Sequence, residues 1–148
     1  MTAVWRRSTR ASGAGSKVCV TDPTLYPELL PESQQTTLFI QSHVRAHAEG
    51  CWILNCVTPI GWLERMTQYK MKAQKQESVL TGLLDYPVLQ AMDILLYDTD
   101  EVPVGEDQVP HLEFSREVVR RFHNLYGEVF VEPQPLLTAT PRLPGLDN

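Results

Sequence analysis

One carboxylate in this chain stands among residue types that are otherwise apolar. Asp93 lies in a run from Tyr86 to Tyr97 in which Val, Leu and Met recur at helical spacing. Tyr86, Gln90, Asp93 and Tyr97 fall at i, i+4, i+7 and i+11, so they share one helix face. Burying an unpaired charge is costly, so Asp93 needs a hydrogen-bond donor. That donor is either a structural partner, such as a backbone amide or an arginine, or a ligand, and the pattern leaves both open.

A second group of polar residues follows a short Val-Pro-Val run, in the turn Gly105-Glu106-Asp107-Gln108. A glycine between a strand and a helix lets a ligand approach the backbone, and helix N-termini favour anions. Two carboxylates on the turn would nevertheless repel a phosphate placed directly on it, and they suit ribose hydroxyls or an ammonium group better. Neither a P-loop nor a GxGxxG motif occurs in the chain. The two groups together predict a small-molecule site that acts by positioning its substrates.

The elements that position these residues follow an α/β pattern with a parallel sheet. Short β-rich runs predict three strands, at Thr36–Gln41, Val102–Val104 and Val129–Val131. Apolar periodicity predicts four helices, one ending near Val57, one beginning at Pro59, one from Pro87 through Leu96, and one from about Asp107 to Gly127. Gln74–Leu84 is expected to be a mobile connection. Ligands of parallel sheets bind beyond the carboxyl ends of the strands, and Val104-Gly105 is such an end.

Length and composition indicate one globular domain. The chain has 148 residues, 43% of them hydrophobic and 21% charged, and a formal net charge of −5. This acidic balance argues against a dedicated nucleic-acid-binding domain. No apolar run approaches the roughly 20 residues that a membrane helix needs. The odd number of cysteines, without the spacing of a disulfide framework, favours a reducing compartment.

Residues 1–35 are expected to be a leader and a Pro-rich loop, either disordered or unrelated to the domain at 36–148. The first 21 residues contain arginine and serine but no acid. This composition is consistent with an organelle transit peptide, although an unrelated leader fits equally well.

Two further groups of residues have both a functional and an ordinary interpretation. The first, His43, His47, Cys51 and Cys56, matches no structural zinc module, and a helix would spread these side chains over different faces, so ordinary helix residues are favoured. The second is the basic run Arg65, Lys70, Lys72 and Lys75, which is more often a solvated helix face than a phosphate site.

Several segments of the chain closely resemble bacterial-type tryptophanyl-tRNA synthetase, a class I aminoacyl-tRNA synthetase. The resemblance extends from Leu38 to Asp147, about three quarters of the chain, and the matching segments are LFIQS (38–42), IGWLERMTQY (60–69), YPVLQAMDILLYDTD (86–100), VPVGEDQ (102–108) and RLPGLD (142–147). VPVGEDQ behind DILLY separates this family from the related tyrosyl enzymes. The resemblance implies a partial Rossmann-like nucleotide-binding domain.

The resemblance also implies a role for each matching residue. Asp93 corresponds to the aspartate that accepts the indole N–H of L-tryptophan. Tyr86 and Gln108 would hold the polar end of the amino acid, Gln90 occupies a pocket position that varies, and Val102 and Val104 would form pocket walls. Gly105, Glu106 and Asp107 correspond to the ATP-binding turn, where the acidic residue takes ribose hydroxyls. The expected cofactor is ATP, as a substrate, together with Mg²⁺.

The expected reaction is attack of the tryptophan carboxylate on the α-phosphate of ATP, followed by transfer to tRNA(Trp). The family's HIGH-type and KMSKS motifs do not occur in these 148 residues, so the chain by itself is expected to be weakly active or inactive. Met92 stands where the family has a small residue, and it would either narrow the pocket or repack the helix. The resemblance further implies a homodimer in the cytoplasm, or in a mitochondrion or plastid if the start is a transit peptide. The alternative function is a non-catalytic tryptophan-binding or dimerisation module.

Overall fold

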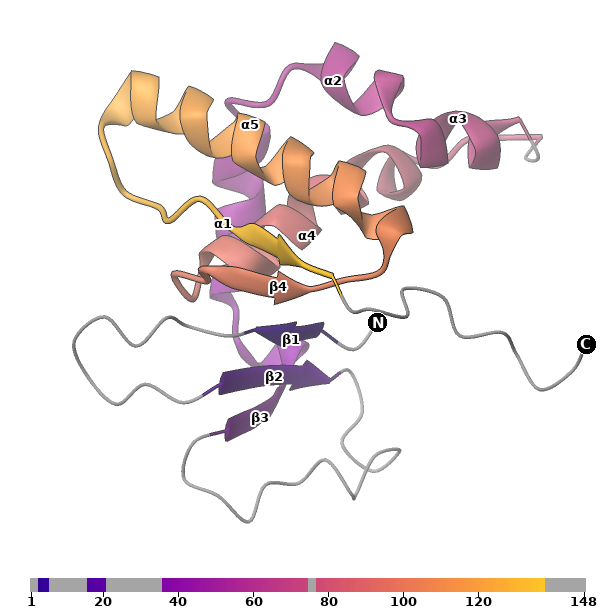
Figure 1. Ribbon diagram of the computed structural model, residues 1–148. Helices are drawn as coiled ribbons and strands as arrows, with labels where there is room; N and C mark the ends of the chain where they lie inside the picture. Colours follow the sequence, from indigo (N-terminus) through magenta and orange to yellow (C-terminus); the bar gives the residue numbers. More distant parts are fainter. Residues whose placement is uncertain (1–2, 6–15, 21–35, 75–76, 138–148) are drawn as a thin grey trace, which may run out of the picture.

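The computed structural model describes residues 3–5, 16–20, 36–74 and 77–137 of the chain. Its helices gather above and behind the strands (Figure 1). The strands are β1 (Ala3–Trp5), β2 (Ser16–Val20), β3 (Thr36–Ile40), β4 (Glu101–Pro103) and β5 (Gln134–Leu136). The helices are α1 (Ala46–Asn55), α2 (Ile60–Arg65), α3 (Thr67–Ala73), α4 (Thr81–Leu95) and α5 (Val109–Tyr126), with 3₁₀ turns η3 (Gln41–His43) and η4 (Glu106–Gln108).

The strands form two small sheets that lie side by side. β1, β2 and β3 are paired in that order, with β1 antiparallel to β2 and β2 parallel to β3. β4 and β5 form a second, parallel pair. β1 lies next to β4, so the strands make a nearly continuous layer (Figure 1). The predicted α/β class with parallel strand pairing is therefore confirmed.

Two of these strands were not anticipated from the sequence. β1 and β2 fall inside the stretch 1–35 that was expected to be a leader and a loop. β2 is the central strand of its sheet, and the Thr36–Ile40 strand that the sequence did predict pairs with it. The predicted Pro-rich loop lies outside the described residues.

Helix α4 begins six residues before the predicted start at Pro87. It runs from Thr81, so part of the expected mobile connection Gln74–Leu84 is helical and Pro87 stands inside the helix. A proline there removes one backbone hydrogen bond. Pro87 is buried almost completely, and the packing around it offsets that loss.

The strand predicted at Val129–Val131 does not form. In its place the chain turns back along the end of α5, where Phe130 packs edge-on against Phe122 with ring centroids 4.9 Å apart. The backbone N–H of Phe130 is donated to Nε2 of His123 at 3.1 Å, so a side chain takes the bond that a strand partner would have used. The last strand forms instead at Gln134–Leu136, beside β4.

The helix predicted from Pro59 is divided in two. Met66 has an extended backbone, with φ −61° and ψ 129°, and it ends α2 before α3 begins at Thr67. α1, α4 and α5 then enclose the main core, which includes Leu54, Val88, Ala91, Leu95, Val118 and Val119. None of the helices in the described ranges combines the length and hydropathy that crossing a bilayer requires.

Candidate functional site

Asp93 lies on α4 and is held by side chains from two other elements. Gln41 follows strand β3, and its Nε2 donates to both carboxylate oxygens, at 2.7 Å to Oδ1 and 2.6 Å to Oδ2. His47 on α1 places Nδ1 2.6 Å from Oδ1. The sequence left open whether a structural partner or a ligand satisfies this carboxylate. Two structural partners are present, and they are an amide and an imidazole rather than a backbone amide or an arginine.

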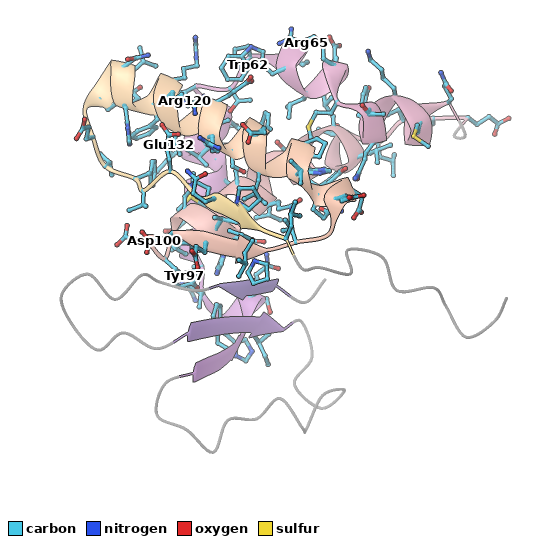
Figure 2. The ribbon with its side chains drawn as sticks, viewed as in Figure 1. Trp62, Arg65, Tyr97, Asp100, Arg120 and Glu132 are labelled. Carbon is cyan, nitrogen blue, oxygen red and sulfur yellow. The ribbon has the colours of Figure 1, made fainter. Side chains whose placement is uncertain are left out.

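The His47 ring is itself held on its other side. Its Nε2 lies 2.8 Å from the hydroxyl of Tyr97, which stands four residues after Asp93 in the turn that follows α4. Phe39 of β3 covers both rings, with centroids 6.1 Å from His47 and 5.3 Å from Tyr97. Tyr97 lies on the side of the helices that faces the three-stranded sheet (Figure 2). These contacts join Tyr97, His47 and Asp93 in one chain of hydrogen bonds, which we call the relay.

The surroundings of Asp93 alter its acidity. Burial raises the pKa of this carboxyl above its ordinary value, and hydrogen bonds from Gln41 and His47 offset part of the rise. The side chain keeps 20% of its surface exposed, whereas that of His47 keeps 4%. The Asp93 side chain is therefore still partly accessible, and the imidazole that holds it is not.

A second polar cluster lies on the same face of α4, towards its start. The hydroxyl of Tyr86 donates to Oε1 of Gln68 at 3.1 Å and lies 3.0 Å from Nε2 of His111. Gln68 in turn donates from Nε2 to the backbone oxygen of Asp107 at 3.0 Å. Gln68 of α3 therefore links Tyr86 to the turn after β4.

Gln90 and Gln108 meet in this second cluster. Gln90 Nε2 donates to Oε1 of Gln108 at 3.4 Å, and Gln108 Nε2 donates to Oδ2 of Asp107 at 2.8 Å. Oε1 of Gln90 is buried and has no hydrogen-bond partner among the described residues. An acceptor is therefore available at this point.

The acidic turn and the two valines lie where the strand β4 meets α5. Val102 is 2% exposed and packs with Ile94 and Leu112, while Val104 is partly buried against the same group. Gly105 precedes η4, in which Glu106 and Asp107 are exposed. The valines thus belong to an apolar cluster with Ile94 and Leu112, and the two acidic residues are exposed at the end of the strand.

Three predicted residues, Tyr86, Gln90 and Asp93, thus lie along one face of α4, about 10 Å long at the 1.5 Å rise of a helix. The other predicted residues lie on β4 and in the turn that follows it. Sequence reasoning missed four residues that hold them, namely Gln41, His47, Gln68 and His111. Gln41 carried a signal, since it is a polar residue at the carboxyl end of a predicted strand. The sequence favours an ordinary helix residue over a zinc ligand at His47, and neither interpretation predicts its contact with Asp93.

Two grooves lie among the described residues, and Tyr86 of this face lines the first of them. One, of about 340 Å³, lies between α1 and α4 and is lined by Cys51, Trp52 and Asp85 among others. The other, of about 430 Å³, lies between α2 and α5 and is lined by Trp62, Arg65 and Arg121 among others. Arg65, the first residue of the predicted basic run, is exposed on α2, near Trp62 (Figure 2).

Comparisons with known proteins point to one family. The profile of the family described as tRNA synthetases class I (W and Y) matches residues 17–148. The tryptophan–tRNA ligase of Synechocystis is 59% identical over 109 residues, which are 70% of this chain and 32% of that protein. That of Gloeobacter violaceus is 50% identical over 133 residues, 89% of this chain and 37% of that protein. The chain thus spans about a third of the length of the curated relatives it matches.

Solved structures of the same kind of protein share the fold. Tryptophanyl-tRNA synthetase from Campylobacter jejuni, in a complex with ADP and tryptophan, aligns with a TM-score of 0.72 and 40% identity. The alignment covers 79% of this chain and 37% of that one. The enzyme from Mycoplasma pneumoniae aligns with a TM-score of 0.67 and 38% identity, over 70% of this chain and 32% of its own.

Proposed function

This chain belongs to the class I tRNA synthetases for tryptophan and tyrosine, and we propose on that premise that it is the tryptophan-recognising part of a tryptophan–tRNA ligase. The observation that carries the proposal is the Asp93 carboxylate, which is partly buried, fixed by Gln41 and His47, and still partly accessible. The proposed reaction is attack of the tryptophan carboxylate on the α-phosphate of ATP, which releases pyrophosphate, followed by transfer of the tryptophanyl group to tRNA(Trp).

Asp93 is the proposed acceptor for the indole N–H. Indole is a flat apolar body with one donor and no acceptor, so an apolar slot with one carboxylate suits it. A carboxylate offers about four lone-pair positions. Oδ1 receives both Gln41 and His47, whereas Oδ2 receives Gln41. Oδ2 therefore has room for a further donor.

The second cluster is the proposed site for the polar end of the amino acid. Tyr86 and Gln108 would hold that end, and Gln90 stands between them and Asp93 with a buried, unpaired Oε1. A ligand ammonium group could satisfy this oxygen, because it brings three donors. Val102 and Val104 would form the apolar walls.

ATP is the proposed second substrate, with its ribose on the turn of Gly105, Glu106 and Asp107. Exposed carboxylates accept hydrogen bonds from ribose hydroxyls, whereas they would repel a phosphate. Mg²⁺ would arrive with the ATP phosphates, which supply its oxygen ligands. In the ranges that the structure describes, no three His, Cys, Asp or Glu side chains are grouped to hold a metal.

The proposed macromolecular partners are tRNA(Trp) and a second copy of the chain, in the cytoplasm. A homodimer is supported by large apolar side chains that are exposed on α1, on α2 and at the end of α5. They include Trp52 at 72%, Ile60 at 62% and Tyr126 at 64% exposure. Such exposed apolar side chains are common at protein–protein interfaces.

Binding of L-tryptophan, measured by calorimetry, tests the proposal with residues that this chain contains. Intrinsic fluorescence is unsuitable, since Trp5, Trp52 and Trp62 would contribute to the signal. Asp93→Asn should weaken binding at least tenfold, because an acceptor of a charged hydrogen bond is worth roughly 1.5–3 kcal/mol. The matched control is Asp85→Asn, which changes the same residue type two turns earlier on α4 and should leave binding unchanged. Equal affinity of the wild type and Asp93→Asn would refute the role of Asp93.

A further inference from the structure

The orientation of the Asp93 carboxylate is fixed by side chains from outside its own helix. Asp93 stands on α4 and Tyr97 in the turn that follows it, and His47 reaches between them from α1. Both nitrogens of the ring are used, and the ring is almost entirely enclosed. Gln41 in the 3₁₀ turn η3 donates a hydrogen bond to each oxygen of the carboxylate. The plane of the carboxylate is therefore set by donors from outside α4.

The contacts also limit where the protons can lie. An ionised carboxylate cannot donate, so the proton between His47 and Asp93 belongs to Nδ1 of the imidazole. When Nε2 carries no proton it is the acceptor, and it receives the hydroxyl proton of Tyr97. Tyr97 thus favours the tautomer that donates to Asp93, because the other tautomer would place two protons between Nε2 and the hydroxyl or rotate that hydroxyl away.

We propose that His47, kept in its Nδ1–H form by Tyr97, is a positioning residue that aims Oδ2 of Asp93 at the donor of the ligand. The inference rests on the proposed function, in which that donor is an indole N–H. His47 acts through Asp93 and touches no substrate. Its loss should therefore remove the preference for a ligand that has the donor, while apolar binding of the ring system remains.

Two substitutions of His47 separate its two nitrogens. His47→Asn keeps an amide donor near the position of Nδ1 and loses the contact with Tyr97. His47→Gln reaches the position of Nε2 and loses the donor to Asp93. If the imidazole only fills space, both variants should lose ligand affinity to a similar extent, since each removes the ring. The positioning role predicts that the two variants differ.

The readout is the ratio of affinities for L-tryptophan and for its benzothiophene analogue, in which sulfur replaces the N–H at nearly the same shape. Calorimetry on the full chain should give a preference for tryptophan of at least tenfold in the wild type. His47→Asn should keep that preference within about threefold. His47→Gln should reduce the ratio to near one with little change in affinity for the analogue. Equal loss of affinity for both ligands in both variants would overturn the proposal.

A second measurement does not depend on any ligand. Nitrogen-15 NMR of the histidine-labelled chain should show a proton on Nδ1 of His47, and Tyr97→Phe should shift the ring towards a mixture of tautomers. A ring protonated at Nε2 instead would contradict the relay. If the wild type binds neither ligand, the proposed function fails, and the NMR result separately decides whether His47 holds Asp93 in the manner described.

Discussion

Met92 lies directly over Gly50, so closely that a Cβ on the glycine would stand 2.5 Å from the Met92 sulfur and 2.8 Å from its Cγ. The contact joins α1 to α4, the two helices that carry His47 and Asp93. The Met92 side chain is 5% exposed and belongs to the main core. The sequence left open whether Met92 narrows the pocket or repacks the helix. The structure shows that it packs against α1.

A double-mutant cycle on this contact should show strong coupling. Gly50→Ala gains up to about 1 kcal/mol of helix propensity but forces Met92 aside, and overpacking costs about 1–3 kcal/mol. Met92→Ala leaves a cavity and should cost about 2–5 kcal/mol. In the double variant the new methyl group occupies part of that cavity, so chemical denaturation should show less destabilisation than the sum of the two changes. Additive effects would mean that the two positions do not compete for space.

Gly127 should tolerate no side chain. It ends α5 with φ 89° and ψ 175°, a backbone region that is essentially restricted to glycine. Gly127→Ala should lower the free energy of unfolding by about 1–3 kcal/mol. Gly82→Ala is the matched control, because Gly82 lies in the first turn of α4 with nothing within 4 Å of an added Cβ. That variant should be neutral or slightly more stable, and equal losses at both positions would contradict the prediction.

Cys51 and Cys56 should differ sharply towards an alkylating reagent. Burial raises the pKa of the Cys51 thiol to about 11, and the charges of Asp85 and Asp93 contribute to the rise. At pH 8 only about one thiol in a thousand would be the reactive thiolate. Cys56 is exposed. Iodoacetamide should therefore modify Cys56 first, and fragmentation of the tryptic peptide 46–65, which holds both residues, will locate the label. Preferential labelling of Cys51 would contradict the described packing of α1.

Ionisation of Asp93 should lower the free energy of unfolding over a defined range of pH. Burial raises its pKa above the ordinary value of 3.8, despite the hydrogen bonds from Gln41 and His47. The protonated form is thus favoured in the folded chain, and its contribution to the free energy of unfolding is fully present below pH 3.8. That contribution is lost as the pH rises through the raised pKa.

Asp93→Asn removes this titration and serves as the reference. The free energy of unfolding of the wild type minus that of the variant should fall between pH 3.8 and the raised pKa, and then level off. Urea unfolding at half-unit steps of pH, with both proteins in the same buffers, provides the measurement. A difference that rises with pH would show that the hydrogen bonds outweigh the burial of the carboxylate.

Local periodicity was sufficient to predict α1, α5 and the central part of α4, because each buries a stripe of apolar residues at helical spacing. It failed where distant residues decided the outcome. Pro87 stands inside α4, where the residues packed around it bury it. Phe130 forms no strand, because its backbone N–H bonds to His123 and its ring packs against Phe122. β1 and β2 form by pairing with each other and with β3, and no strong alternation of residue types marked them in advance.

The sequence by itself determined the family, the helix face with Tyr86, Gln90 and Asp93, and the acidic turn at Gly105–Gln108. Helical spacing is a local property, so the shared face of these residues could be read before any fold was known. Only the tertiary structure decided what holds Asp93. Gln41 and His47 are 52 and 46 residues away along the chain, and packing of β3 and α1 against α4 brings them to 2.6–2.7 Å from its carboxylate. Hydrogen bonds of that separation depend on the whole fold, since no local pattern specifies which distant donor will meet a buried charge.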